Sequence, residues 1–175
     1  FVAIDGEHVD GHNFIDKALD NGAAAIACTR AIDVAAPHIK ASDSRQVCAI
    51  YGQLIRDRFH GSVIGITGSA GKTTAKSFLE SICGLAGATV ATLGTQNNEL
   101  GVPLTLARLS ADPTFAVVEM GASQKGDIAY LKSMAAPHVV VLLNALEAHV
   151  GRFGSLEAIV ETKGEILDDL TASDT

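Results

Sequence analysis

The stretch at residues 65–74, reading Gly-Ile-Thr-Gly-Ser-Ala-Gly-Lys-Thr-Thr, restricts the fold of this chain more than any other. It overlaps an apolar run at residues 63–66 and precedes a segment whose apolar side chains have helical spacing, namely Phe78, Leu79, Ile82 and Leu85. A strand, a glycine-rich loop and a helix in this order favour a phosphate-binding loop, because small residues let consecutive backbone N–H groups turn toward one anion. The positive end of the following helix points to the same place.

The predicted phosphate contacts are Gly68, Ser69, Ala70, Gly71, Lys72, Thr73 and Thr74. Lys72 would reach the β- and γ-phosphates of a nucleotide, and the hydroxyl of Thr73 would bind the accompanying Mg²⁺. The usual pattern has a further glycine five positions before Gly71, where this chain has Ile66, so the loop is a shorter variant. The alternative is a glycine-rich turn that begins an ordinary helix; the strand, lysine and threonine together favour the phosphate loop.

The charge balance of the chain argues against a nucleic-acid surface. The chain has 13 basic and 20 acidic residues, a net charge of −7, no Trp and two Tyr, whereas nucleic-acid surfaces are basic and often carry aromatic side chains.

No apolar run is long enough to cross a membrane and no signal peptide is visible, so we expect a cytoplasmic protein. The three cysteines, odd in number and set in apolar segments, indicate buried thiols rather than disulfides or a zinc site.

The sequence divides into two expected domains, residues 1–41 and 42–175. In the first, apolar runs at residues 1–4 and 24–28 predict two strands around a short helix, a β-α-β unit of about the minimal size. Residues 29–41 have little periodicity and are predicted to be an irregular connection.

The second expected domain begins with a helix capped by Asp43 or Ser44 and then alternates strands and helices. Strands after the phosphate loop are predicted at residues 90–93, 115–118 and 139–143. Near-continuous apolar strands separated by helices indicate a parallel sheet covered on both faces. We therefore predict the α/β fold class: a phosphate-loop central domain with a mostly parallel sheet flanked by helices, preceded by a small α/β N-terminal domain.

Polar residues follow the predicted strands at the sheet edge where ligands bind in open α/β folds. Glu119 ends the apolar run at residues 115–118, as does the Mg²⁺-binding acid in the second motif of phosphate-loop enzymes. His149 follows the last predicted strand by a few residues. We expect both to converge with Thr73; a solvated strand end for Glu119 and a surface position for His149 stay open as alternatives.

Lys163 has an unusual position for a cation. The final predicted helix is capped by Ser155, and helical spacing places Lys163 within its apolar stripe. Burial lowers the pKa of a lysine and favours the neutral, nucleophilic amine. The alternative is a side chain that extends over the apolar surface to a nearby carboxylate such as Glu161 or Glu165.

Several stretches together resemble the Mur ligases of peptidoglycan synthesis. They are Thr-Gly-Ser-Ala-Gly-Lys-Thr-Thr at residues 67–74, Thr-Gln-Asn-Asn-Glu-Leu-Gly-Val-Pro at 95–103, Val-Glu-Met-Gly-Ala-Ser at 118–123, His149 with Gly-Arg-Phe-Gly-Ser-Leu at 151–156, and Thr-Lys-Gly-Glu-Ile at 162–166. Residues 1–14 are also similar to the uridine-binding N-terminal domain of the later ligases of that pathway. The similarity covers almost the whole chain, and the stretches at residues 97–103 and 119–122 narrow it to the member that adds D-Ala-D-Ala.

The resemblance implies an ATP-dependent ligase that adds D-Ala-D-Ala to a UDP-N-acetylmuramoyl tripeptide through an acyl phosphate. Lys72 and the loop amides would bind the phosphates of ATP. Thr73 and Glu119 would hold one Mg²⁺, and His149 would help to hold a second. Lys163 matches a lysine that is carbamylated by CO₂ in this family, which would make it an anionic metal ligand. The predicted catalytic residues are therefore Lys72, His149 and Lys163.

The same resemblance implies substrate contacts. Asn97 and Asn98 would contact the UDP-muramyl peptide, and Glu7, His8 and Val9 match a segment that touches the uridine side in related ligases. The implied partners are the UDP-muramyl tripeptide and D-Ala-D-Ala; we expect a monomer with no nucleic-acid partner and no membrane insertion. Parts of the family pattern before residue 1 and after residue 175 are missing, so we expect no ligase turnover from this stretch alone.

Two other functions stay open. A folylpolyglutamate-type ligase would share the phosphate loop and the carbamylated lysine but should lack the uridine-binding opening. A nucleotide-binding switch would use the loop without ligation. Binding of a folate would favour the first alternative, and a preference for GTP without acyl-phosphate chemistry would favour the second.

Overall fold

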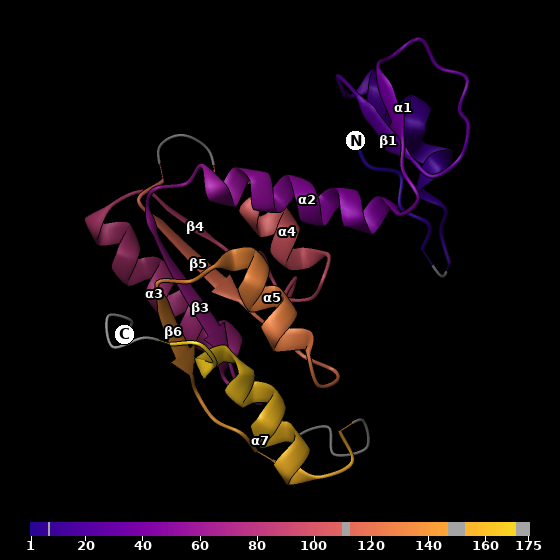
Figure 1. Ribbon diagram of the computed structural model, residues 1–175. Helices are drawn as coiled ribbons and strands as arrows, with labels where there is room; N and C mark the ends of the chain where they lie inside the picture. The colour runs from indigo at the N-terminus through magenta and orange to yellow at the C-terminus, as the bar shows by residue number, and fades with distance from the viewer. Residues whose placement is uncertain (7, 110–112, 147–152, 171–175) are drawn as a thin grey trace. The chain divides into compact units, whose positions relative to one another are not determined.

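The computed structural model describes residues 1–6, 8–109, 113–146 and 153–170. The chain divides into two compact units, Phe1–Ile50 and Tyr51–Thr175. Each contains helices and parallel strands (Figure 1), which confirms the α/β fold class predicted from the sequence. The division between the units lies within one helix, α2 (Ser44–Asp57). The domain boundary expected near residue 41 stays a prediction.

The first unit has a two-stranded parallel sheet beside short helices. The 3-10 helix η1 (Gly11–Phe14) continues into α1 (Ile15–Asp20), and β1 (Ile26–Cys28) pairs with β2 (His38–Lys40). The buried core of the unit consists of Ala3, Ile15, Ile26 and Cys28. This core is small because the unit is short.

Two details of the first unit differ from the sequence-based expectation. The strand predicted at residues 1–4 is reduced to one parallel bridge between Val2 and Ala27. The segment at residues 29–41, predicted as an irregular connection, contains β2. All three residues of β2 are exposed, so the strand leaves no apolar pattern in the sequence.

The second unit is built on a four-stranded parallel sheet with the order β4-β5-β3-β6. Its strands are β3 (Ser62–Thr67), β4 (Thr89–Ala91), β5 (Phe115–Glu119) and β6 (Val139–Leu142). The two inner strands, β3 and β5, are buried over almost their whole length, as their continuous apolar runs predict. The register pairs Ile66 with Glu119, so the carboxyl ends of both strands lie at the same edge of the sheet.

Helices cover both faces of this sheet (Figure 1). α3 (Lys72–Ala86) packs on the face that carries Ile64 and Ile66. α4 (Gly101–Leu106) and α5 (Asp127–Ala135) lie against the opposite face. α7 (Leu156–Gly164) runs into the 3-10 turn η2 (Glu165–Leu167) beside α5. The helices therefore leave the carboxyl edge of the strands to the loops.

The apolar side chains that mark α3 in the sequence are mostly exposed. Phe78, Ile82 and Leu85 are 65%, 62% and 91% exposed, whereas Cys83 and Lys76 are buried. The Lys76 ammonium is accommodated because it donates a hydrogen bond to the backbone carbonyl of Thr92 at 2.9 Å. A paired cation thus lies on the inner face of this helix, which the apolar spacing does not predict.

All three cysteines are buried as free thiols, as their apolar surroundings predict. None of the helices in the described ranges combines the length and the hydropathy that a membrane span requires.

Candidate nucleotide and metal site

The glycine loop lies between the end of β3 and the start of α3. Gly68 and Gly71 have φ angles of +155° and +82°, which residues with a side chain rarely adopt. Lys72 begins α3, followed by Thr73 and Thr74 in its first turn. Among the described residues, no side chain caps this turn, so its backbone N–H groups can bind an anion.

Contacts from two sides hold the loop in shape. The Lys72 ammonium donates a hydrogen bond to the Gly68 carbonyl at 2.6 Å, which places the cation over the loop. Asn144, just beyond β6, accepts a hydrogen bond from the Ala70 N–H at 3.0 Å and donates one to the Ala70 carbonyl at 3.2 Å. Asn144 was missed by sequence reasoning, although its place after a strand at the carboxyl edge of the sheet is the signal that could have identified it.

Glu119 is the central acid at this edge. It ends β5 and is only 1% exposed, so the alternative of a solvated strand end is wrong. Its Oε1 accepts hydrogen bonds from Asn97 Nδ2 at 2.7 Å and from Thr73 Oγ1 at 3.4 Å. Its Oε2 is buried without a hydrogen-bond partner among the described residues. Such an oxygen has lost its water without compensation, which costs free energy unless another group binds it.

Thr73 and Glu119 fit the Mg²⁺ role predicted for them. Both offer oxygen atoms, which Mg²⁺ prefers, and Glu119 Oε2 is an acceptor that lacks a partner among the described residues. Mg²⁺ is usually held by one or two carboxylates together with phosphate oxygens and water. One carboxylate and one hydroxyl beside a phosphate loop are therefore a suitable set of donors.

Lys163 is buried on α7, as the helical spacing predicts; the residue is 4% exposed. Its ammonium lies 5.7 Å from the centre of the Phe153 ring. Burial, together with repulsion from the charge of Lys72, lowers the pKa of Lys163 to about 8, although Asp127 and Glu165 oppose this shift. The electrostatic coupling to Lys72 relates Lys163 to the glycine loop.

The two carboxylates considered as surface partners for Lys163 have other partners. Glu161 forms an exposed ion pair with Lys125 at 2.8 Å. Glu165 is buried and accepts hydrogen bonds from the backbone N–H groups of Gly126 and Ala129 at 2.7 and 3.0 Å. Glu165 therefore joins the end of α7 to the start of α5, where a helix favours negative charge.

The predicted substrate contacts are spread over the chain. Asn97 binds Glu119, and Asn98 Oδ1 accepts hydrogen bonds from backbone N–H groups at the start of α4, the closer being that of Gly101 at 2.9 Å. His8 and Val9 are exposed residues of the first unit. Their contacts with a UDP-muramyl peptide stay predictions. Glu7 and His149 lie outside the described residues.

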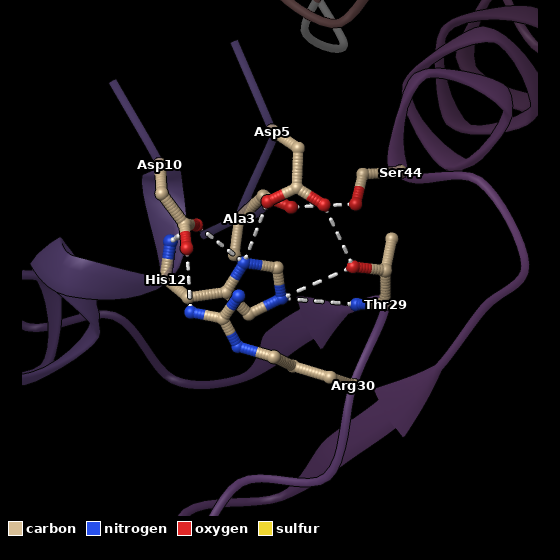
Figure 2. A network of polar contacts seen from close by, with 7 residues as sticks. All are labelled: Ala3, Asp5, Asp10, His12, Thr29, Arg30 and Ser44. Atoms are coloured by element: carbon tan, nitrogen blue, oxygen red, sulfur yellow. Dashed lines mark hydrogen bonds and ion pairs between the residues drawn. The ribbon is translucent and has the colours of Figure 1, made fainter. Parts of the chain in front are cut away.

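A polar network in the first unit has the spacing of a metal site but is filled by its own hydrogen bonds (Figure 2). His12 Nε2 accepts the Thr29 N–H at 3.1 Å, so in the neutral ring the proton is on Nδ1. Nδ1 lies 2.8 Å from Asp10 and 3.2 Å from Asp5. Hydrogen bonds from His12 and Arg30 hold the pKa of Asp10 well below its usual range. Both ring nitrogens are therefore in use, and the network is structural.

Two family descriptions match the chain. Residues 1–67 match "Mur ligase family, catalytic domain", and residues 66–175 match "Mur ligase middle domain". Together they cover both compact units, and the second includes all the described residues placed at the glycine loop and Glu119.

Individual proteins are similar to this chain over nearly its whole length. The UDP-N-acetylmuramoyl-tripeptide--D-alanyl-D-alanine ligase of Escherichia coli is 37% identical over 97% of this chain, which spans 38% of that protein. A crystal structure of MurF from Acinetobacter baumannii has a TM-score of 0.90 and 36% identity, covering 99% of this chain and 39% of that one. The MurF ligase of Thermotoga maritima in complex with ADP has a TM-score of 0.84 and 41% identity, covering 95% and 39%.

Proposed function

Because the chain belongs to the Mur ligase family, we propose that it is part of an ATP-dependent enzyme that adds D-Ala-D-Ala to a UDP-N-acetylmuramoyl tripeptide. The names of its relatives support this substrate pair. In the proposed reaction, the tripeptide carboxylate takes the γ-phosphoryl group of ATP and ADP leaves. The amine of D-Ala-D-Ala then attacks the acyl carbon, phosphate leaves, and the amine loses a proton as the peptide bond forms.

The observation that carries this proposal is the Glu119 carboxylate: its Oε1 accepts from Thr73 in the first turn after the glycine loop, and its buried Oε2 lacks a hydrogen-bond partner among the described residues. In the proposed enzyme, the loop amides and Lys72 bind the nucleotide phosphates, and Thr73 and Glu119 hold Mg²⁺. Bound Mg²⁺ would neutralise charge on the transferring phosphoryl group. The ADP complex of the Thermotoga maritima relative supports nucleotide binding by this kind of protein.

We also propose that Lys163 is carbamylated. Its neutral amine would attack CO₂, a nitrogen–carbon bond would form, and one proton would be released, leaving an anionic carbamate. The lowering of the Lys163 pKa to about 8 supports this, because a larger share of the amine is neutral near pH 7 than for an exposed lysine. The nearby Lys72 charge would favour the anion, which would then act with His149 as a metal ligand.

The remaining assignments follow the family resemblance. Asn98 is proposed to contact the muramyl peptide, and Glu7, His8 and Val9 the uridine side of the substrate. A monomeric enzyme in the cytoplasm is proposed, because the substrates are soluble nucleotide-linked precursors.

The test is phosphate release by the complete natural protein that contains this chain, with UDP-muramyl tripeptide, ATP and Mg²⁺, and with or without D-Ala-D-Ala. We expect phosphate release to depend on the dipeptide. Lys163→Ala should abolish release, and a short-chain carboxylic acid should restore part of it. Lys125→Ala is the matched control, because this lysine is exposed and its ion pair with Glu161 lies at the surface.

Phosphate release that does not need the dipeptide would contradict the ligase proposal. Release that depends on a folate instead of the UDP-muramyl tripeptide would point to the folylpolyglutamate-type alternative. A Lys163→Ala variant as active as the Lys125→Ala control would contradict the carbamate.

A further inference from the structure

Glu119 is oriented by a side chain that lies 22 residues earlier in the chain. Asn97, in the loop between β4 and α4, donates its Nδ2 hydrogen to Glu119 Oε1 at 2.7 Å. The backbone of Glu119 is fixed as well, since its N–H donates to the Thr92 hydroxyl at 2.9 Å. Glu119 is therefore held at its backbone and at its carboxylate by two residues of the same loop.

Asn97 is itself held in place. Its backbone carbonyl accepts the Gly121 N–H at 2.7 Å. Its side-chain amide lies directly against the Cα of the same glycine: a Cβ at Gly121 would stand 2.5 Å from Asn97 Oδ1 and 2.8 Å from its Cγ. The residue two positions after Glu119 must therefore be glycine for the amide to lie where it does.

The two oxygens of Glu119 consequently differ. Oε1 accepts the short hydrogen bond from Asn97, with Thr73 at the longer distance of 3.4 Å. Oε2 is buried and has no partner among the described residues. An amide donor on one oxygen only fixes the rotation of the carboxylate and leaves the other oxygen as an acceptor, which is what an outer-shell partner of a metal ligand does.

We propose that Asn97 is a positioning residue that orients Glu119 so that Oε2 binds the divalent cation, and that Gly121 provides the space for its amide. This inference rests on the proposed function and deepens its metal site. It gives Asn97 a role different from the substrate contact that the family resemblance implies, because one N–H of its amide is bound to Glu119 within the chain.

The first experiment measures Mn²⁺ binding, with Mn²⁺ as a paramagnetic probe for the Mg²⁺ site. The complete natural protein is titrated with Mn²⁺ in the presence of ADP, and free Mn²⁺ is followed by electron paramagnetic resonance. We expect Asn97→Ala to raise the Kd for Mn²⁺ at least about tenfold, as loss of an outer-shell partner does. Gln96→Ala, an exposed residue of the same loop, is the matched control and should bind as wild type does.

Steady-state kinetics separate the two roles of Asn97. If Asn97 orients Glu119, the Mg²⁺ concentration needed for half-maximal activity rises, whereas the KM for the UDP-muramyl tripeptide at saturating Mg²⁺ stays as in wild type. A raised KM for the tripeptide with an unchanged Kd for Mn²⁺ would make Asn97 a substrate contact and overturn the inference. Wild-type protein that binds no Mn²⁺ with ADP would instead overturn the proposed metal site itself.

A double-mutant cycle with Gly121→Ala keeps the test independent of any one variant. The added methyl group displaces the Asn97 amide, so Gly121→Ala alone should weaken Mn²⁺ binding about as much as Asn97→Ala. In the Asn97→Ala background the space is open, and the same substitution should change the Kd no further. Additive losses would show that the two residues act separately and would overturn the inference. Circular dichroism melts of all variants confirm that folded proteins are compared.

Discussion

Replacing Lys163 by methionine separates the stability effect of the buried ammonium from that of the side chain's length. The pKa of this lysine falls from an ordinary 10.5 to about 8. Each pH unit corresponds to roughly 1.4 kcal/mol, so burial and the nearby Lys72 charge together cost the cation about 3 kcal/mol. Methionine removes this cost, but the variant also loses the contact between the ammonium and the Phe153 ring, which offsets roughly 1 kcal/mol of the stability gained. We therefore expect Lys163→Met to raise the free energy of unfolding by about 2 kcal/mol at pH 7.

The sign of the pH dependence follows from the lowered pKa. Below pH 8 the lysine is protonated in both the folded and the unfolded protein, and the folded state bears the full cost of the buried charge. Between pH 8 and 10.5 the folded protein has lost the proton while the unfolded chain still holds it, so wild-type stability rises relative to the variant. The cost of the buried charge should thus fade over this range.

The assay is urea unfolding of the complete protein, followed by circular dichroism in buffers freed of CO₂, from pH 7 to pH 10. Lys125→Met serves as the control, because its exposed side chain should leave the unfolding midpoint unchanged at every pH. A Lys163→Met variant that is less stable than wild type at pH 7 would refute the reasoning. So would a difference between variant and wild type that stays constant with pH.

Three further predictions concern the stability of the second unit. A Cβ at Gly52 would lie 2.8 Å from the backbone of Pro103, so Gly52→Ala should lower the free energy of unfolding by about 1–3 kcal/mol. Gly84→Ala should instead raise the free energy of unfolding by about 0.5–1 kcal/mol, because a Cβ there meets no other atom within 4 Å. A urea unfolding midpoint equal to that of wild type would contradict the prediction for either variant. Arg56, buried, donates to Ala135 O at 2.7 Å, so Arg56→Met should cost at least about 1–3 kcal/mol, and an unchanged melting temperature would contradict this.

The inner part of the sheet could be predicted because its signal is local. β3 and β5 are continuous apolar runs, and Ser155 caps α7 by accepting the Ala158 N–H at 3.2 Å. β2 could not be predicted, since three exposed residues carry no periodic pattern. The buried face of α3 could not be predicted for another reason. Lys76 lies on that face, and its ammonium is paired with the backbone carbonyl of Thr92, a residue outside the helix.

The candidate site shows the same division between local and distant signals. The meeting of Thr73 and Glu119 follows from the rule that the carboxyl ends of parallel strands share one edge. The burial of Lys163 follows from helical spacing. The hydrogen bond from Asn97 to Glu119 could not be predicted, because it depends on the packing of a loop against a strand.

The strand order of the sheet has a consequence for folding. β3, which leads into the glycine loop, is the first of the four strands in the sequence, yet it lies between β5 and β6. Its contacts close long loops: Thr67 binds Met120, 53 residues later, and Val63 binds His138, 75 residues later. Pairs so far apart in sequence form slowly, because the entropy of loop closure is lost before the contacts are gained. During synthesis, the strand that carries the glycine loop therefore stays unpaired until β5 has been made, and its second edge stays open until β6 has been made as well.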